Sequence, residues 1–312
     1  MEMRVAAVQA SPVFLDRERT IGKVVTLIEE AAVGGAKLVA FPETFVAGYP
    51  SWADFTAASR FDDPAQKKAF AQYLTSAVDV GAGDLNPVVA ASADTGCFIY
   101  LGIAERSTSG GSIYCTLVAI HPEAGIIGTH RKLKPTYGER MMWADGDGAG
   151  LRAHDFDDTR VSGLSCWENW MPLARAAMYA QGTMVHVATW PGSPGISHDI
   201  SRFAAMEGRM FVISSGAVLR DEHLPADFAL RDEMIATHDR YASGGSIIVA
   251  PDGTVLAEAE KHVETIIYAD LDLDLVSQER QNFDPTGHYS RPDVFDLSVD
   301  RRRRESVSFI EE

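Results

Sequence analysis

The stretch Val161-Ser162-Gly163-Leu164-Ser165-Cys166-Trp167-Glu168-Asn169-Trp170-Met171-Pro172 holds a short apolar run that stops abruptly at a cysteine. Pro172 then opens residues 173–181, which predict a helix, because proline is well tolerated in the first turn of a helix. We therefore expect Cys166 in a strand-to-helix turn close to free backbone N–H groups, a setting that favours a thiolate and can hold an anion beside it. A lone cysteine is also compatible with a buried, inert core residue. Its role therefore depends on what the rest of the chain supplies.

Length and charge limit the classes of protein to which the chain can belong. Its 312 residues fit one large α/β domain with a substantial core. The formal net charge of −16 predicts a surface that repels nucleic acid and anionic lipid. No apolar run approaches the length of a membrane span. We therefore expect neither nucleic acid nor a membrane as a partner.

The cysteines and the first residues indicate a compartment. The chain has three cysteines, Cys97, Cys115 and Cys166. They show no C-x-x-C spacing, and their odd number does not suit a framework of paired disulfides. This usage favours a reducing compartment and argues against a structural zinc site. The segment 1–8 has no basic region followed by an apolar one, so we expect no signal peptide. A cytoplasmic location is the resulting prediction.

The beginning of the chain predicts a β-α-β unit. Residues 5–9 are typical of a buried strand, residues 20–31 of an amphipathic helix with Thr20 as its N-cap, and residues 37–41 of a second strand. Such a unit pairs its strands in parallel through a right-handed crossover. Glu43 then lies just past the carboxyl end of an interior strand, where open α/β sheets place their sites. Taken alone, it is equally compatible with a local cap or turn residue.

A hairpin meander and a basic segment follow. Strand-like runs at residues 98–105, 113–120 and 126–130 predict antiparallel pairing, so the sheet is expected to be mixed. Residues 130–140 then concentrate basic side chains in an acidic chain, directly after a strand. An isolated run of this kind is usually a solvated turn. Because Lys132 alternates with its neighbours, however, only some of these side chains can face inward.

Strands and helices continue to alternate in the C-terminal half. Strands are predicted at residues 183–188 and 210–219, with a helix at residues 199–207 between them. The polar segment 220–242 has little pattern and is expected to form a lid-like loop or an interface. Residues 246–258 predict a hairpin. Because the chain has no internal repeat and no convincing linker, it is expected to form one domain.

Three motifs, in this order along the chain, resemble those of the nitrilase branch of the carbon–nitrogen hydrolase superfamily. They are Phe41-Pro42-Glu43, then Arg131-Lys132-Leu133-Lys134-Pro135-Thr136 with Glu139-Arg140, then Cys166-Trp167-Glu168-Asn169 with Pro172-Leu173; the late segment Gly287-His288-Tyr289-Ser290-Arg291-Pro292-Asp293 is also similar. The resemblance covers residues 5–295. It implies an α/β fold, a four-layer α-β-β-α sandwich with two mixed sheets. It also implies a single domain of residues 1–295, followed by a tail of residues 296–312.

The resemblance implies a catalytic site as well. Carried over by position, it makes Glu43 the general base, Lys132 the charge stabiliser and proton donor, and Cys166 the nucleophile. Glu139 is then a supporting carboxylate that keeps the lysine charged and oriented. A thiolate suits a nitrile carbon, which is a poor electrophile. The backbone N–H of Trp167 would complete an oxyanion-type hole.

Aromatic residues are the candidates for substrate binding. Tyr49 and Trp190, with Trp167, are expected to line an aromatic pocket, although aromatic residues in such places are as often plain packing. No cluster of metal-ligating residues stands out in the sequence, and the chemistry needs neither a metal nor an organic cofactor. His130 is predicted to be structural and His288 to pack the tail, because a strand-end glutamate already fills the role of base.

The leading hypothesis is a nitrilase that converts an organic nitrile to the carboxylic acid and ammonia through a thioimidate and a thioester. An amidase or carbamoylase would use the same three residues, and a cyanide hydrolase is a special case with a very small substrate. Trp167-Glu168-Asn169 after the cysteine resembles the nitrilase branch rather than the amidases. A catalytically silent assembly protein on this fold is a further alternative. The choice among aliphatic, aromatic and arylacetic nitriles is left open.

The resemblance also implies homodimers, which can stack into longer spirals. Residues 173–181 are the candidate dimer face. The short tail beyond Phe295 favours a homodimer or small homo-oligomer over extended filaments. The run Arg301-Arg302-Arg303-Arg304 is most simply a solvated tail, or it docks on the acidic body of a second subunit.

Overall fold

The computed structural model describes residues 2–108, 110–237 and 240–304 and contains two six-stranded sheets. The first has the order β14-β1-β2-β3-β4-β5, with the bounds β1 Glu2–Gln9, β2 Leu38–Ala40, β3 Phe98–Arg106, β4 Ile113–His121, β5 Gly125–Arg131 and β14 Thr265–Asp272. The second has the order β13-β12-β9-β8-β7-β6, with the bounds β6 His154–Phe156, β7 Thr159–Ser165, β8 Val185–Trp190, β9 Phe211–Gly216, β12 Ile247–Val249 and β13 Val255–Glu258. Each sheet has parallel central strands flanked by antiparallel ones, so both are mixed, as predicted.

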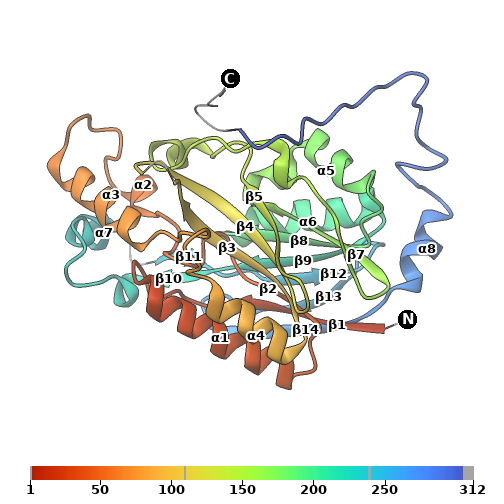
Figure 1. The fold of residues 1–312 in the computed structure, drawn as a ribbon, viewed down its shortest axis with the longest axis horizontal. Helices are drawn as coiled ribbons and strands as arrows, with labels where there is room; N and C mark the ends of the chain where they lie inside the picture. Colours follow the sequence, from red (N-terminus) through yellow and green to blue (C-terminus); the bar gives the residue numbers. More distant parts are fainter. Residues whose placement is uncertain (1, 109, 238–239, 305–312) are drawn as a thin grey trace, which may run out of the picture.

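Helices cover the outer face of each sheet (Figure 1). α1 (Arg17–Val33) and α4 (Asn86–Thr95) pack on the first sheet, and α5 (Pro172–Tyr179) and α6 (Pro194–Gly208) pack on the second. The two sheets face each other across a second apolar layer. The predicted four-layer α-β-β-α sandwich is therefore confirmed.

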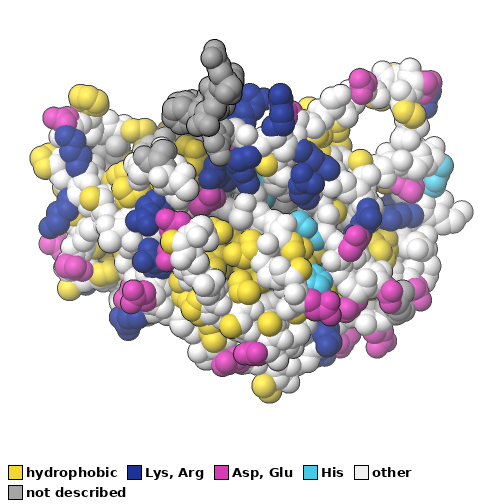
Figure 2. Space-filling view, in the orientation of Figure 1, with side chains coloured by type: hydrophobic (Ala, Val, Ile, Leu, Met, Phe, Trp, Pro, Cys, Tyr) yellow, Lys and Arg dark blue, Asp and Glu magenta, His cyan; other side chains and the backbone are white. Residues whose placement is uncertain are grey.

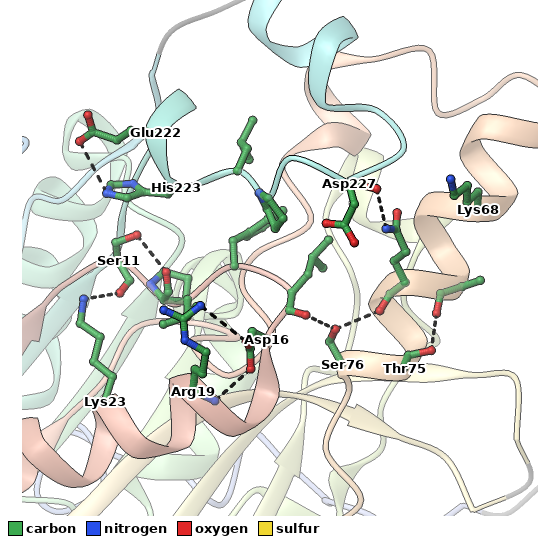
Figure 3. A pocket seen from close by; sticks show the side chains of 18 of the residues that line it. Ser11, Asp16, Arg19, Lys23, Lys68, Thr75, Ser76, Glu222, His223 and Asp227 are labelled. Atoms are coloured by element: carbon green, nitrogen blue, oxygen red, sulfur yellow. Dashed lines mark hydrogen bonds and ion pairs between the residues drawn. The ribbon is translucent and has the colours of Figure 1, made fainter.

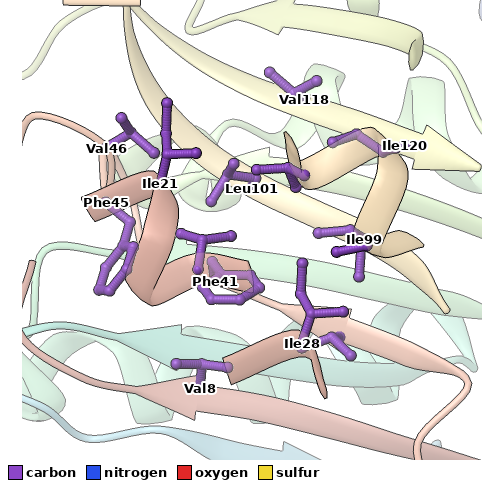
Figure 4. Close-up of a cluster of buried hydrophobic side chains, with 14 of the residues drawn as sticks. Val8, Ile21, Ile28, Phe41, Phe45, Val46, Ile99, Leu101, Val118 and Ile120 are labelled. Atoms are coloured by element: carbon purple, nitrogen blue, oxygen red, sulfur yellow. The ribbon is translucent and has the colours of Figure 1, made fainter. Parts of the chain in front are cut away.

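Alternation along the strands fills both faces of the first sheet. In β1, Val5 and Ala7 point between the two sheets, whereas Ala6 and Val8 point toward the covering helices. Ile28 of α1 packs against the outer cluster, as Figure 4 shows. Because burying one such aliphatic side chain stabilises the fold by about 1.5–3 kcal/mol, these layers form a firm support for the strand ends.

The first helix begins earlier than its sequence pattern predicts. α1 starts at Arg17, and its N-cap is Asp16, whose carboxylate accepts from the backbone N–H of Arg19 at 3.0 Å. The predicted cap, Thr20, lies inside the helix, and its hydroxyl donates to the carbonyl of Val13 at 2.9 Å. Asp and Thr both cap helices well, so only the exact position was wrong.

Several short elements gather at one end of the sandwich (Figure 1). They are α2 (Trp52–Phe55), α3 (Pro64–Ser76), α7 (Arg231–Thr237), β10 (Val218–Arg220) and β11 (Arg240–Ser243), and most contribute to one apolar cluster. The prediction of a lid-like loop for the segment 220–242 is therefore wrong, because β11 pairs with β10 and α7 buries Met234. The alternative prediction, an interface, stays a prediction, and residues 238–239 lie outside the described part. The remaining elements are α8 (Asp274–Arg280) and the 3₁₀ turns η1 (Tyr137–Met141), η2 (Gly148–Gly150), η3 (Cys166–Trp170) and η4 (Asp221–His223).

The arginine run of the tail docks on its own chain. The guanidinium of Arg303 donates to Oδ1 of Asp147 at 3.2 Å and to the carbonyl of Thr129 at 2.8 Å, and the backbone N–H of Arg304 donates to Oδ2 of Asp147 at 2.8 Å. The expectation of a solvated tail is therefore wrong for Arg303. Basic side chains gather near this end of the described chain (Figure 2). Docking on a second subunit stays a prediction.

The molecular surface mixes charged and apolar side chains. On the face shown in Figure 2, acidic and basic groups are interspersed with apolar ones. Within residues 2–108, 110–237 and 240–304, no helix combines the length and the apolar character that a membrane crossing requires.

Candidate active site

Glu43, Lys132 and Cys166 follow the carboxyl ends of strands in two different sheets. Glu43 comes after β2 and Lys132 after β5 in the first sheet, and Cys166 comes after β7 in the second. All three are buried, with exposed fractions of 1%, 1% and 4%. The backbone N–H of Glu43 donates to the carbonyl of Trp190, at the end of β8, at 3.3 Å, which joins the two sheets here. The fold thus brings together the three residues that the motifs singled out.

Lys132 joins two buried carboxylates. Its ammonium donates to Oε1 of Glu43 at 2.8 Å and to Oε2 of Glu139 at 2.7 Å. Glu139 is itself held by the backbone N–H of Thr136, 2.6 Å from Oε2, and by the hydroxyl of Tyr49, 3.0 Å from Oε1. One ammonium therefore serves two acids, and Tyr49 supports Glu139 in addition to its expected place in the pocket.

Cys166 begins η3 with a left-handed backbone angle φ of +53°. A residue with a side chain in this region carries a strain of about 1–2 kcal/mol, so its surroundings must hold the turn in place. Asn169 does so from within the turn, because its Nδ2 donates to the carbonyls of Leu164 at 3.2 Å and Cys166 at 3.0 Å. The predicted strand-to-helix turn is confirmed, with a 3₁₀ turn inserted before α5.

Glu168 links the cysteine turn to the lysine segment, a role that the sequence analysis missed. Its Oε1 accepts from the backbone N–H of Leu133 at 2.6 Å and its Oε2 from that of Ser165 at 3.0 Å, while Nε2 of His130 lies 3.0 Å from both oxygens. Burial raises the pKa of Glu168, but His130 and the backbone donors act more strongly, so the net pKa lies below its usual value. The Ser165-x-x-Glu168 spacing of a capping box was the available signal.

His130 and His288, which are not expected to act as bases, lie outside the pocket that opens at Cys166. His130 is the buried partner of Glu168 and is structural, as predicted. His288 is exposed after α8, and its ring centroid lies 5.4 Å from that of its neighbour Tyr289. Neither histidine lines the pocket.

The site also contains three groups of the kind that bind metal ions. The sulfur of Cys166 and one carboxylate oxygen from each of Glu43 and Glu139 all lie within 4.8 Å of one another. The ammonium of Lys132 bonds to both carboxylates, however, so the chain itself supplies the positive charge there. This donor set therefore does not fit a resident metal ion.

Burial controls the protonation of the resting site. It raises the pKa of Glu43 to about 7, against the lowering effect of Lys132. It also raises the pKa of the Cys166 thiol, and the nearby Glu43 raises it further. Burial lowers the pKa of Lys132, but the surrounding acids raise it more, so the lysine stays charged. The expected thiolate is therefore wrong for the resting site, because backbone N–H groups do not outweigh burial beside carboxylates.

A pocket of about 230 Å³ opens at Cys166. The three aromatic residues predicted to bind substrate, Tyr49, Trp167 and Trp190, all line it, as does Glu139. Trp167 is partly exposed, whereas Trp190 is buried. The backbone N–H of Trp167 contacts the Cys166 sulfur and lowers its pKa. This contact is compatible with the expected oxyanion role, which stays a prediction.

A larger hollow, shown in Figure 3, shares no lining residue with this pocket. It has a volume of about 810 Å³ and lies between α1, α3 and the segment after β10. Its charged side chains are largely satisfied within the protein; for example, Lys23 donates to the carbonyl of Ser11 at 2.8 Å and to Glu264 at 2.7 Å. None of the clustered site residues lines it.

Comparison with known proteins agrees with this geometry. The family model of carbon-nitrogen hydrolases matches residues 4–281. A nitrilase of Bradyrhizobium diazoefficiens is 39% identical over 92% of this chain and 89% of its own length, and an aliphatic nitrilase of Sinorhizobium fredii is 39% identical over 98% of both. The crystal structure of a carbon-nitrogen hydrolase from Helicobacter pylori superposes with a TM-score of 0.72 at 18% identity, covering 94% of this chain and 97% of that one.

The architecture alone defines a class of α-β-β-α sandwiches in which a cysteine, a lysine and a glutamate meet at the strand ends. The family match then narrows this class, and the chain belongs to the carbon-nitrogen hydrolase family. The resemblance drawn from the motifs is therefore confirmed. The single-domain boundary at residue 295 and the individual roles of the site residues stay predictions.

Proposed function

We propose that this protein is a nitrilase that hydrolyses an organic nitrile to the carboxylic acid and ammonia. The observation that carries the proposal is the convergence of the Cys166 sulfur, the Glu43 carboxylate and the Lys132 ammonium in one buried centre. A pocket leads to the sulfur. Full-length relatives with the name nitrilase, 39% identical to this chain, support the same reaction.

The first step is the attack of the sulfur on the nitrile carbon. Glu43 accepts the thiol proton through Oε2, which has no hydrogen-bond partner among the described residues, whereas Oε1 is bonded to Lys132. A C–S bond forms, one π bond of the nitrile breaks, and the electron pair moves to nitrogen. Lys132 donates a proton to that nitrogen, which gives a neutral thioimidate, and then recovers a proton from Glu43 across their 2.8 Å hydrogen bond.

Two water molecules complete the reaction. Glu43, again ionised, deprotonates the first water as it adds to the thioimidate carbon. The nitrogen takes one proton of this water by way of Glu43 and Lys132 and the other from the new hydroxyl group. It leaves as ammonia when the C–N bond breaks, and the carbonyl of a thioester forms. A second water, deprotonated in the same way, displaces the Cys166 sulfur, which takes up the proton as the carboxylic acid forms.

Glu139 and Tyr49 hold the lysine in place for this sequence. The second carboxylate favours the ammonium form of Lys132 and fixes its direction, since Glu139 is bonded both to the lysine and to the backbone. A preorganised cation beside the nitrogen stabilises the charge that develops there. Glu139 therefore acts through Lys132.

The alternative functions either use the same catalytic centre or involve no catalysis. An amidase or carbamoylase would need the same thiol, base and ammonium. Hydrogen cyanide would occupy only a small part of a pocket of about 230 Å³. A silent assembly protein would bury four ionisable groups with no use for them, which is costly for a fold.

Release of ammonia from a panel of nitriles and from the matched amides tests the proposal. We expect faster turnover of the nitriles, with a carboxylic acid as product and a mass increase at Cys166 when an acyl adduct is trapped. Cys166→Ala should abolish turnover. Faster turnover of the amides would make the protein an amidase, and unchanged turnover in Cys166→Ala would remove the activity from this site.

We further propose that the nitrilase works in the cytoplasm as a homodimer or a higher homo-oligomer. Apolar side chains of η3, α5 and α6 are exposed on the outside of the second sheet, including Trp170, Leu173 and Phe203. An exposed patch of this kind usually marks an interface. It includes Leu173, the first residue of the segment 173–181 that is expected to form a dimer face, whereas most of that segment is buried within the chain.

A further inference from the structure

The pocket at Cys166 carries negative charge. Asp54 of α2 and Glu139 are the charged residues that line it among the described residues, and both are acids. Glu139 shares the ammonium of Lys132 with Glu43, so above about pH 7, where Glu43 is ionised, one positive charge faces two carboxylates in the floor. Asp54 adds a further carboxylate. No basic side chain of the described chain lines the pocket to offset it.

Asp54 lies beside the turn that carries Glu139. A Cβ atom added to Gly138 would lie only 2.6 Å from Oδ1 of Asp54, so the carboxylate rests against the backbone of η1. Asp54 forms no ion pair with another described residue. Burial and the nearby Glu139 raise the pKa of Asp54, and a hydrogen bond with Tyr49 lowers it less strongly. Because no cation of the described chain neutralises this carboxylate, it can attract a cationic ligand in the pocket, and the glycine allows its close approach to η1.

Aromatic rings make up most of the remaining wall. Phe55, Tyr137, Trp167, Trp190 and Tyr241 all line the pocket. Such rings pack against an apolar or aromatic body, and their faces attract cations. The volume of about 230 Å³ is below the usual range for drug-sized ligands, which limits the substrate to a small molecule.

Three features lie together in this pocket: an acid that has no ion-pair partner among the described residues, an aromatic wall, and a floor without excess positive charge. From their joint position we infer that the preferred substrates are small nitriles that carry a cationic amine. Asp54 is the residue that selects them, through charge attraction at the pocket. Anionic nitriles are disfavoured by the same field, and the net charge of −16 acts in the same direction during approach. This inference rests on the proposed nitrilase function and specifies its substrate class.

Three nitriles of nearly equal shape test the selection. The probes are phenylacetonitrile, its 4-aminomethyl derivative and its 4-carboxy derivative, assayed for ammonia release at pH 8. The kcat/KM of each charged probe is divided by that of the neutral one, for the wild type, for Asp54→Asn, and for Asp94→Asn. Asp94 is exposed on α4 and does not line the pocket, so its variant removes the same charge elsewhere.

We expect the wild type to favour the cationic probe over the anionic one. Asp54→Asn should lower the cationic-to-neutral ratio about fivefold, mainly through KM, and raise the anionic-to-neutral ratio, because a nearby charge in partly solvated surroundings is worth about this much. Asp94→Asn should leave both ratios as they are. Damage to the fold alone would reduce all three rates together and leave the ratios unchanged.

Unchanged ratios in Asp54→Asn, or a wild type that prefers the anionic probe, would overturn the inference and leave the nitrilase function standing. A wild type that releases ammonia from none of the three nitriles, but does so from the matched amides, would overturn the proposed function itself. The two failures are therefore distinguishable.

Discussion

The thiol of Cys115 lies 3.4 Å from Oε1 of Glu43, the same oxygen that accepts from Lys132 at 2.8 Å. Two donors therefore hold one oxygen of this carboxylate, and the other oxygen has no partner among the described residues. Cys115 also favours the ionised form of Glu43 and so acts against the effect of burial on its pKa. We regard Cys115 as a positioning residue that leaves Oε2 available to take the proton of Cys166.

Replacing Cys115 tests this relationship. Cys115→Ala removes a donor to the ionised carboxylate, so the pKa of Glu43 should rise and the acidic limb of the kcat/KM profile should move to higher pH. Below this limb, kcat/KM should fall about fivefold, the worth of one hydrogen bond. Cys115→Ser keeps a donor and should retain most of the wild-type profile. If the acidic limb of the kcat/KM profile lies at the same pH in the wild type and in Cys115→Ala, Cys115 is not a positioning residue for Glu43.

The raised pKa of Glu43 predicts how activity depends on pH. A base must be ionised to accept the thiol proton, so kcat/KM should rise with pH through about 7. Because Glu43, Lys132 and Cys166 are coupled, this limb belongs to the cluster rather than to one residue. Glu43→Gln should lower kcat at least about 100-fold and abolish the limb. A wild-type profile that is flat from pH 5 to 8 would count against Glu43 as the base.

The same shift has a consequence for stability. Between the usual value of 4.5 and about 7, folded Glu43 retains a proton that the unfolded chain has lost. Its contribution to the free energy of unfolding therefore falls as pH rises through this window. Urea unfolding at several pH values measures this effect. The free energy of unfolding should fall more steeply with rising pH for the wild type than for Glu43→Gln, and equal slopes would contradict the raised pKa of Glu43.

Most of the site was predictable because its residues follow strand ends. Glu43, Lys132 and Cys166 each follow the end of a predicted strand, and strand ends of an α/β fold meet along one edge. The layers were predictable for a similar reason, since buried strands and amphipathic helices leave local patterns. Once the motifs were recognised, the sequence was enough to select the three residues.

The contacts that support the site were not predictable, because they join segments far apart in the chain. Cys115 looks like one more apolar residue of β4, and only the folded sheet brings its sulfur to Glu43. Glu168 meets Leu133 only when the two sheets face each other. The protonation of Cys166 was misjudged because it depends on burial, which a local turn pattern does not reveal.

Glu168 should contribute strongly to stability. It is buried, and its carboxylate holds Leu133, Ser165 and His130 at once. Glu168→Gln leaves these partners incompletely satisfied and should lower the free energy of unfolding by about 3 kcal/mol, the scale for breaking a buried pair. Urea unfolding measures this change, with the exposed Glu222→Gln as the control.

The lowered pKa of Glu168 predicts the pH dependence of this contribution. A carboxylate with a depressed pKa stabilises the fold above its usual value of 4.5, and this stability is lost as pH falls through the lower, folded value. The difference between wild type and Glu168→Gln should therefore narrow below about pH 4. A difference that stays constant down to pH 3 would show that the carboxylate charge is not what holds the turn.

Self-association should depend on the exposed apolar side chains of η3, α5 and α6. Leu173 is 67% exposed, and Trp170 and Phe203 are 40% and 47% exposed, so burial against a second copy would remove a large apolar area from water. Sedimentation of the wild type at micromolar concentration should give at least twice the mass of the chain. Leu173→Asp should shift the protein to monomer, because a charge in the middle of an apolar interface is left without a partner.

Val33→Asp is the matched control, since Val33 is 92% exposed on α1, which covers the other sheet. A monomeric wild type, or a Leu173→Asp variant that associates as tightly as Val33→Asp, would place any interface elsewhere on the molecule.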